Sequence, residues 1–407
     1  MTDEVPGLDR VLSPQGWPLA SAPSTGPGDP GRFAALYGRD SLITSLQLMP
    51  VRPDVARASL RALAELQGGR DDPRTDEEPG KIPHEVWDQA PERLKAGGWP
   101  VTDDGGLRYY GSADSTCWFL VVLAALEEAD LAAELEPSWR AAGQWLERVL
   151  DRGAGFVRHG PRRAPGGLAQ QGWRDAVDPT DPNEHGGGVV RPDGEAPHPP
   201  LADADTQAVA VMALRAHARL SGDPSRLMAA DELSERIGDA FDPDTAALEA
   251  DGRRVPGPGS WLGWLLWADA LPPELAAGFA ERLLREDVRS RWGLRTLSSE
   301  HPAFRPDSYH RGSVWPFDCW LGWGGLRAVG AHEEAERVRA GVLEALELLG
   351  LWPELYAVTD EGPRAIPVAN RIQAWTVGAA WALEHGFEGR ITALDGRVQA
   401  GGRGGNG

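Results

Sequence analysis

Residues 117–123 read CWFLVVL and residues 374–381 read AWTVGAAW, and neither run contains a charged side chain. A helix without a polar face has to be buried on all sides. Stretches of the same kind recur along the chain, and we expect buried helices to start near Asp40, Ser112, Asp203, Gly259, Ser313 and Asn370. The sequence therefore predicts six buried helices, which is more than a two-layer domain of this length would need.

Buried stretches alternate with stretches that carry one apolar stripe. In residues 53–67, Leu60 and Leu63 lie on one helical face, while Arg57 and Arg61 lie on the other. Stretches that begin at Pro137 and Glu333 repeat this pattern. The alternation predicts a repeated helical hairpin. Closed on itself, the repeat forms an all-α (α/α)6 barrel with an inner and an outer ring.

An open α-solenoid is the alternative closure of the same repeat, and it would make the chain an interaction protein. Its inner helices would need a polar concave face, which these stretches lack, so we favour the barrel. The twelfth helix is the uncertain element: it is either a short stretch after Glu388 or absent. We expect one catalytic barrel over residues 31–398, a partly ordered segment over 1–30 and a flexible tail over 399–407.

Composition excludes several classes of partner. The net charge of −20 argues against nucleic acid and anionic membranes, and it favours a neutral or cationic small molecule. Cys117 and Cys319 lie in apolar runs and show no disulfide or metal spacing. The chain has no signal-peptide pattern at Met1 and no apolar run of about 18 residues, so we expect a cytoplasmic protein. We expect no cofactor and no metal, and the oligomeric state is not predicted.

The seventeen tryptophans favour a sugar ligand, because a pyranose has an apolar face that packs on an indole. Packing between helices is the alternative role for them. The segments just before the buried helices are rich in glycine, aromatic and charged residues. In a barrel these segments meet at one end, where a binding funnel would form. The long connections over 68–108 and 151–201 are typical of lids or binding loops.

Two carboxyl groups in such segments have aromatic neighbours. Asp175 ends the sequence QQGWRD (170–175), and Glu354 lies within LWPELY (351–356). Burial against an indole raises the pKa of a carboxyl, as a general acid requires. The alternatives are that Asp175 only pairs with Arg174 and that Glu354 is a surface residue. Since both enter the same rim from opposite sides, they form the pair that glycoside hydrolysis needs.

A series of short motifs occurs in order along the chain: YGRDSLIT (37–44), PGKIPHE (79–85), YYGS (109–112), QGWRD (171–175), SYHRGSVWP (308–316), PEL (353–355) and QAW (373–375). Over residues 32–385 the series resembles the amylo-α-1,6-glucosidase catalytic domain of glycogen-debranching-type proteins. This family shares a six-hairpin barrel with the glucoamylase, trehalase and processing α-glucosidase families.

The resemblance implies exo-acting, inverting hydrolysis of an α-glucosidic bond in an oligosaccharide or small glucoside. By its motifs Asp175 is the general acid and Glu354 the general base, about 6.5–9.5 Å apart. The same resemblance assigns substrate binding to twelve residues: Tyr37, Arg39, Asp40, His84, Tyr110, Trp173, Arg174, His310, Arg311, Trp315, Gln373 and Trp375. From the residues alone, Asp40 is also a candidate N-cap of the first buried helix.

The sequence departs from that family on the side of the leaving group. We expect no β-rich domain before the barrel, and HRG at 310–312 replaces the usual HNG. Two alternatives therefore stay open. The same fold would act on trehalose or on a mannosyl- or glucosyl-glycerate, with Arg311 contacting the carboxylate. Otherwise the chain is a catalytically silent carbohydrate-binding barrel.

Overall fold

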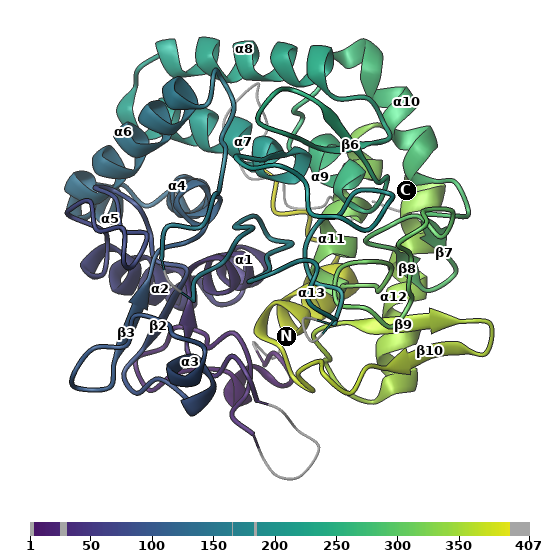
Figure 1. Cartoon of the computed structure of the whole chain (residues 1–407), viewed down its shortest axis with the longest axis horizontal. Helices are drawn as coiled ribbons and strands as arrows, with labels where there is room; N and C mark the ends of the chain where they lie inside the picture. Colours follow the sequence, from purple (N-terminus) through teal and green to yellow (C-terminus); the bar gives the residue numbers. More distant parts are fainter. Residues whose placement is uncertain (1–3, 25–30, 165, 183–184, 391–407) are drawn as a thin grey trace, which may run out of the picture.

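The computed structural model describes residues 4–24, 31–164, 166–182 and 185–390 (Figure 1). Six buried helices form an inner ring: α1 (Gly38–Leu48), α4 (Ser115–Leu126), α7 (Ala204–Ser221), α9 (Trp261–Trp267), α11 (Pro316–Ala328) and α13 (Ala374–His385). Each contacts the next in chain order, and α13 returns to contact α1. The ring is closed, which confirms the (α/α)6 barrel and excludes the solenoid.

Amphipathic helices pack around this ring. They are α2 (Pro53–Glu65), α6 (Glu136–Arg152), α8 (Ser225–Ala240), α10 (Pro273–Leu283) and α12 (His332–Leu349), with the short α5 (Ala129–Glu134) ahead of α6. Each of the five follows one inner helix along the chain and packs against it. Helix α2 begins at the predicted Pro53, while α6 and α12 each begin one residue ahead of the predicted positions.

In the described part of the chain, the N-terminal segment takes the sixth outer place. Val5, Leu8 and Val11 are buried, and the 3-10 helix η1 (Leu8–Arg10) contacts α13. Gly7 has φ 85° and lies so close to the Trp352 ring that a Cβ there would be 2.9 Å from it. A segment that we expected to be partly ordered is therefore packed over residues 4–24. The predicted tail over 399–407 lies outside the described residues.

The stretch after Glu388 that we considered for the twelfth helix lies outside the described residues beyond residue 390, and the residues that lead into it are bonded to the inner ring. The indole N–H of Trp320 donates to the carbonyl of Phe387 at 2.7 Å, and that of Trp267 donates to the carbonyl of Glu388 at 2.9 Å. These two bonds tie residues 387–388 to α9 and α11. Two of the many tryptophans thus serve to hold this segment against the inner helices.

Much of the tryptophan content serves packing inside the ring. Trp118, Trp264, Trp267 and Trp320 are at most 1% exposed, and their rings meet one another at centroid distances near 6 Å. Large indoles fill a wide barrel interior, so the alternative explanation of their number holds for these four. Trp173 continues the stack toward the site, 5.7 Å from Trp264 and nearly parallel to it.

The strands lie in the connections that lead from outer to inner helices. One antiparallel sheet pairs β1 (Leu36–Tyr37), β2 (Glu85–Trp87) and β3 (Leu107–Tyr109), and a second pairs β4 (Ala202–Asp203), β5 (Thr245–Leu248) and β6 (Arg254–Pro256). The remaining pairs are β7 (Arg289–Ser290) with β8 (Gly293–Leu294) and β9 (Tyr356–Thr359) with β10 (Gly362–Ala365); α3 spans Glu92–Ala96.

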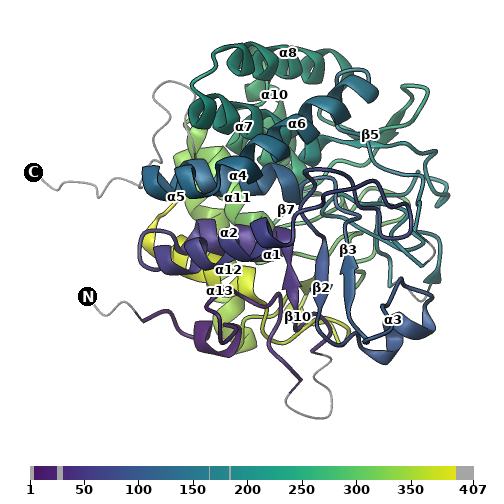
Figure 2. The same cartoon turned by 90° about the vertical axis from the view of Figure 1, so that its left-hand side faces the viewer.

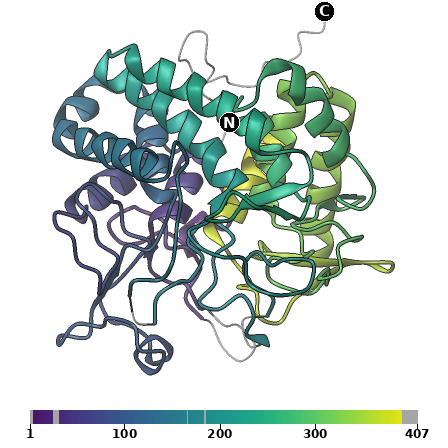
Figure 3. The same cartoon turned by 45° about the horizontal axis from the view of Figure 1, so that its top comes forward.

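These connections gather at one end of the barrel. Figure 2 shows β2, β3, β5 and α3 to the right of the helices, and Figure 3 shows the long connections below them. Strand β1 leads directly into α1, and β4 leads directly into α7. The expected convergence of the segments that precede the inner helices is therefore confirmed.

Candidate active site

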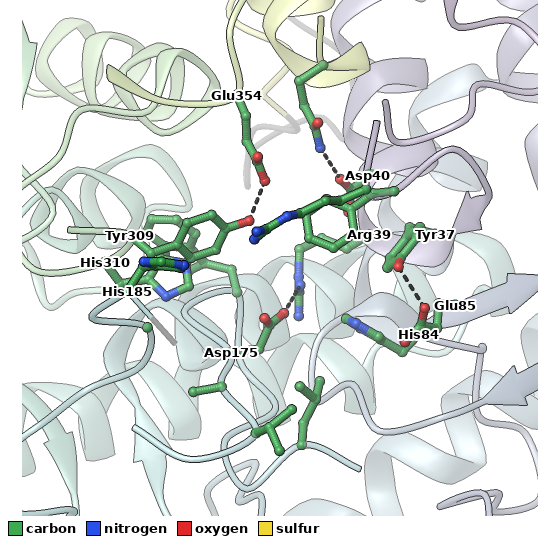
Figure 4. A pocket seen from close by; sticks show the side chains of 18 of the residues that line it. Tyr37, Arg39, Asp40, His84, Glu85, Asp175, His185, Tyr309, His310 and Glu354 are labelled. Carbon is green, nitrogen blue, oxygen red and sulfur yellow. Dashed lines mark hydrogen bonds and ion pairs between the residues drawn. The ribbon is translucent and has the colours of Figure 1, made fainter. Parts of the chain in front are cut away.

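A cavity of about 280 Å³ opens at this end of the barrel (Figure 4). The first turns of α1 and α13 form its floor, and residues from the long connections form its walls. Eleven of the fourteen predicted site residues line it: Tyr37, Arg39, Asp40, His84, Trp173, Asp175, His310, Trp315, Glu354, Gln373 and Trp375. The ordered motifs thus come together around one cavity.

Three predicted binding residues lie outside the lining, each for a visible reason. The hydroxyl of Tyr110 donates to the carbonyl of Leu66 at 2.8 Å. Arg174 is buried, and its Nε donates to Asp205 at 3.1 Å. Arg311 donates to the carbonyls of Pro179 and Gly187, so its guanidinium stabilises the loop that contains these two residues. Because Arg174 pairs with another carboxylate, the alternative of a simple Arg174–Asp175 pair is wrong.

Sequence reasoning missed several residues of the lining. Tyr309 and Glu85 lay within the quoted motifs but were not selected, although their position beside His310 and His84 was a usable signal. Other missed residues are Arg32, Phe33, Arg93, Leu94, Trp99, Leu168, Ala176, Val177, His185 and Gly187. These come from α3 and from loops that only the tertiary structure brings to the cavity.

Asp175 enters the cavity from one side and is held by a cation. Its side chain is 24% exposed, and Oδ2 accepts a hydrogen bond from Nη1 of Arg39 at 3.1 Å. The rest of the Arg39 guanidinium is occupied by Asp114, at 2.8 and 3.0 Å, and by the carbonyl of Gly172 at 2.9 Å. Burial raises the pKa of Asp175 to about 7, against the opposing charge of Arg39.

Glu354 enters from the opposite side and is held by neutral donors (Figure 4). It is 1% exposed, so the alternative of a surface residue is wrong. Its Oε1 accepts a short hydrogen bond from the hydroxyl of Tyr309, and Oε2 accepts from the backbone N–H and the Nδ2 of Asn370, both at 3.1 Å. Burial raises the pKa of Glu354 to about 7, and these hydrogen bonds oppose that rise.

A line of hydrogen bonds joins Glu354 to Asp40 on the floor. Asn370 donates to Gln373 Oε1 at 3.1 Å, and Gln373 Nε2 donates to Asp40 Oδ1 at 3.0 Å. Burial raises the pKa of Asp40 to about 8. Helix α1 has Tyr37 at its N-cap, so the candidate cap role of Asp40 is wrong. Its carboxyl is directed to the cavity instead.

Neutral imidazoles complete the walls. Nδ1 of His310 accepts the backbone N–H of Gly188 at 3.0 Å, which places the imidazole proton on Nε2. That Nε2–H is buried and has no partner within the described residues. Burial lowers the pKa of His310 and of His84 well below the usual range, so both rings are neutral. Such groups are ready donors or acceptors for sugar hydroxyls.

The described residues contain no group of three or more His, Cys, Asp and Glu side chains that could hold a metal ion. Over the same residues, no helix combines the length and hydropathy needed to cross a membrane. The cavity therefore offers two opposed carboxyls, aromatic walls and hydrogen-bonding groups, a set suited to acid–base chemistry on a sugar.

Solved structures similar to the chain extend over its whole barrel. The GH63 mannosylglycerate hydrolase from Thermus thermophilus, in complex with Tris and D-glycerate, is 18% identical with a TM-score of 0.68, covering 94% of this chain and 98% of that one. The same enzyme in complex with glucose is 19% identical with a TM-score of 0.64, covering 92% and 97%. Neutral trehalase from Saccharomyces cerevisiae is 16% identical with a TM-score of 0.56, covering 90% and 76%. No curated protein matches the chain by sequence.

The closed ring and these likenesses show the six-hairpin fold, and the family model that matches the chain makes it a glycoside hydrolase. The chain belongs to the mannosylglycerate hydrolase MGH1-like glycoside hydrolase domain family, whose model matches residues 38–376. The superfamily and the enzyme class predicted from the motifs are confirmed. For the substrate, the family supports the expected alternative, a hexosyl-glycerate or trehalose, better than the debranching subtype.

Proposed function

We propose that the protein is an inverting hydrolase of small α-glycosides whose leaving group carries a carboxylate, of the mannosyl- or glucosyl-glycerate class. The observation that carries this proposal is the pair of buried carboxyls, Asp175 and Glu354, that enter one small cavity from opposite sides in an MGH1-like domain. In this proposal Asp175 is the general acid and Glu354 the general base.

The proposed reaction needs one proton transfer at each carboxyl. The Asp175 carboxyl protonates the glycosidic oxygen as the bond from that oxygen to the anomeric carbon breaks. A water molecule attacks the anomeric carbon from the other face and gives its proton to the Glu354 carboxylate. The products are the free sugar, with its anomeric configuration inverted, and the leaving group with a restored hydroxyl.

Their surroundings support this division of roles. Glu354 accepts three hydrogen bonds, and hydrogen bonds to a carboxylate favour the ionised form that a base needs. Among the described residues, Asp175 accepts a hydrogen bond from Arg39, which also pairs with Asp114. In addition to burial, the charge of Asp175 raises the pKa of Glu354, so the two carboxyls interact, and we expect Glu354, which accepts more hydrogen bonds, to ionise first.

The size of the cavity favours a short substrate. A volume of about 280 Å³ lies at the lower limit for drug-sized ligands, so a disaccharide-sized glycoside suits it better than a branched glucan. The aromatic walls that include Trp173, Trp315 and Trp375 provide apolar surface for the sugar ring.

Two arginines support an anionic leaving group. Arg32 and Arg93 line the cavity, and neither forms an ion pair with a carboxylate within the described residues. Nη2 of Arg93 donates to the carbonyl of Arg32 at 2.6 Å, which brings the two residues together. The net charge of the chain favoured a neutral or cationic ligand, but these local cations outweigh it because a distant charge is screened by salt. Arg311, expected to contact the carboxylate, is occupied by backbone carbonyls.

A substrate panel tests this proposal. We expect hydrolysis of mannosylglycerate or glucosylglycerate, with kcat/KM at least ten times that for trehalose or for an α-1,6-linked glucoside. Proton NMR during the first minutes should show the β-anomer of the sugar. Preference for trehalose would favour trehalose as the substrate, and preference for an α-1,6-linked oligosaccharide would restore the debranching prediction. First appearance of the α-anomer would contradict the inverting mechanism.

The leaving-group arginines have a test of their own. Arg93→Gln should raise KM for a hexosyl-glycerate about tenfold, the size of one lost charge-assisted hydrogen bond. The same variant should leave KM for trehalose, if it is hydrolysed at all, within twofold. A matched control is Arg61→Gln on the outer face of α2, which should change neither value. An equal effect of Arg93→Gln on both substrates would show that the arginine does not read the carboxylate.

A further inference from the structure

A second cavity, of about 250 Å³, shares no lining residue with the first. It lies beside the C-terminal half of α6, between the segments around residues 76–81 and 157–163. Its lining carries four cationic side chains and two carboxylates: Lys81, Arg152, Arg158, Arg163, Asp76 and Glu78. The lining residues therefore carry an excess of two positive charges in a chain with a net charge of −20, and Asp71, outside the lining, pairs with one of these cations, Arg163.

The two carboxylates are already committed to other groups. Glu78 pairs with Arg152 at 2.7 Å and lies 3.7 Å from Arg163. Asp76 accepts hydrogen bonds from the hydroxyl of Tyr109 at 3.0 Å and from Gln171 at 3.2 Å. Glu78 and Asp71 thus pair with the more exposed cations, Arg152 and Arg163, which leaves Lys81 and Arg158 without a carboxylate partner among the described residues.

Lys81 is the deepest of the cations. It is 5% exposed, and within the described residues its ammonium has one hydrogen bond, to the carbonyl of Asp76 at 3.3 Å. An ammonium group has three donors, and burying one with so few partners is costly unless an anion accompanies it. The single long contact leaves capacity for two further acceptors.

Two further donors line the same cavity. Arg158 donates to the carbonyls of Gly153, Pro200 and Glu249, at 2.9 to 3.2 Å, and pairs with no carboxylate among the described residues. Trp145 is 2% exposed, and its indole N–H has no partner in the described part of the chain. A buried N–H without an acceptor is rare, so this one indicates a missing partner.

We propose that this cavity binds a small phosphate-bearing anion, held by Lys81 and Arg158, with the Trp145 N–H as a further donor. A phosphate monoester carries about −1.5 to −2 charges at neutral pH and three acceptor oxygens. It matches both the excess of two positive charges and the three available donors. The cavity also has room for a small organic group attached to the phosphate.

The site lies behind the wall that carries the proposed acid. Gln171 lines it and lies four residues before Asp175 in the chain. Ser112 lines it as well, and its hydroxyl contacts Asp114 at 2.9 Å, the main partner of Arg39. The two cavities are therefore separate but share a supporting wall, and the proposal does not depend on the substrate of the first one.

Isothermal titration calorimetry in a chloride buffer of constant ionic strength tests the proposal, with inorganic phosphate and glucose 6-phosphate as the two probes. We expect saturable binding to one site by at least one of them. Binding of the sugar phosphate alone would indicate a phosphate ester as the natural ligand, and equal binding of both would indicate the free ion. Absence of saturable binding of both, or binding of sulfate and citrate but of neither probe, would overturn the proposal.

Variants show which of the two cavities binds the anion. Lys81→Met and Arg158→Gln should each weaken binding at least tenfold, with circular dichroism as the check that each variant is folded. Arg158 is only half-buried, so it remains testable should Lys81→Met fail to fold. Arg93→Gln, which removes a cation from the first cavity, and Asp175→Asn should bind the probe with wild-type affinity. Loss of binding in Arg93→Gln, with Lys81→Met unaffected, would place the anion in the first cavity and refute the proposal.

Discussion

The carboxyls on the two sides of the active-site cavity have the same pKa through burial, but they contact different kinds of group. Asp175 is partly exposed and contacts a cation, whereas Glu354 is almost fully buried and contacts only neutral donors. Burial raises the pKa of each to about 7. The charge of Arg39 opposes this rise at Asp175, the proposed acid, whereas neutral hydrogen-bond donors oppose it at Glu354, the proposed base.

This difference has a chemical consequence. A proton donor has to swing toward the glycosidic oxygen, and a single contact to Arg39 leaves Asp175 free to do so. A base has to direct one lone pair at water, and donors from Tyr309 and Asn370 fix the orientation of Glu354. A cation could hold the carboxylate in the same orientation, but its full charge would lower the pKa of the carboxylate and make it a weaker base.

The largest expected effect comes from removing each carboxyl. Asp175→Asn and Glu354→Gln should each lower kcat by about 10³-fold on the natural glycoside, within the range known for general acids and bases. On the corresponding glycosyl fluoride, which departs without a proton, Asp175→Asn should recover most of its rate and Glu354→Gln should not. Steady-state kinetics with both substrates measures the difference.

These variants need a check on folding, and Asp318→Asn serves as a matched control. Asp318 is a buried carboxyl with a pKa also raised to about 7 by burial, but it does not line the cavity. It should keep most of its activity on both substrates. If Glu354→Gln rather than Asp175→Asn recovers its rate on the glycosyl fluoride, the two assigned roles are reversed. If both variants lose the same rate on the fluoride, neither role is supported.

The next largest effect should come from Arg39→Lys. Lysine keeps the charge but loses the fork that holds Asp114 and Asp175 together, so we expect kcat to fall about 10²-fold. The Arg39 charge opposes the rise in the pKa of Asp175. Weakening the contact should raise that pKa, so the alkaline limb of the profile of kcat/KM against pH should move to higher pH.

Arg174→Lys provides the comparison for this variant. Arg174 is equally buried and pairs with Asp205 at 3.1 Å, yet it lies outside the cavity lining. Arg174→Lys should lower Tm by about as much as Arg39→Lys does, and it should move neither limb of the profile of kcat/KM against pH. If Arg174→Lys also shifts the alkaline limb, the effect reports a general loss of packing rather than a contact to the acid.

The sequence allowed the ring, the carboxyl pair and the cavity floor to be predicted, because each depends on local pattern. Helices such as α4 have no charged residue to place in water, and Asp175 and Glu354 stand beside tryptophan or tyrosine in short turns. The acid–base roles themselves came from the family resemblance and stay a prediction.

The rest depended on contacts between distant segments. Arg39 contacts Asp114 and Asp175, which lie 75 and 136 residues away in the chain. No local sequence pattern predicts contacts over such separations. Arg311 had the right chemistry for a carboxylate, but its partners are backbone carbonyls more than a hundred residues away. Under our proposal of an anionic leaving group, net charge is a poor guide for a similar reason, because it averages over a surface while Arg32 and Arg93 line the cavity.

A smaller effect should follow from Tyr309→Phe. The phenol donates to Glu354 and thereby lowers the pKa of that carboxyl. Without it the pKa should rise, so the acid limb of kcat/KM should move to higher pH, with kcat at neutral pH falling about tenfold. Tyr356→Phe is the control, since Tyr356 is a fully buried phenol that donates to the carbonyl of Trp292 away from the cavity. An unchanged acid limb in Tyr309→Phe would show that Glu354 is not the group titrating there.

The smallest effect concerns stability. The pKa of Asp175 is about 7 in the folded chain and 3.8 in a model peptide, so its charge opposes folding. This cost is absent below pH 4, grows as the pH rises and is complete above pH 7. Asp175→Asn should therefore raise Tm at pH 8 by about 1–2 °C, as roughly 1 kcal/mol does in a large domain, and the gain should vanish near pH 4.

Glu354→Gln separates the two sides of the cavity in the same experiment. Its new amide would direct N–H groups at donors from Tyr309 or Asn370, so the gain from losing the charge should be cancelled by a lost hydrogen bond. Thermal denaturation at pH 4, 6 and 8 measures both variants. Equal stabilisation of the chain by Glu354→Gln and Asp175→Asn would mean that the neutral donors hold Glu354 no more strongly than Arg39 holds Asp175. That result would contradict the contrast between the two sides.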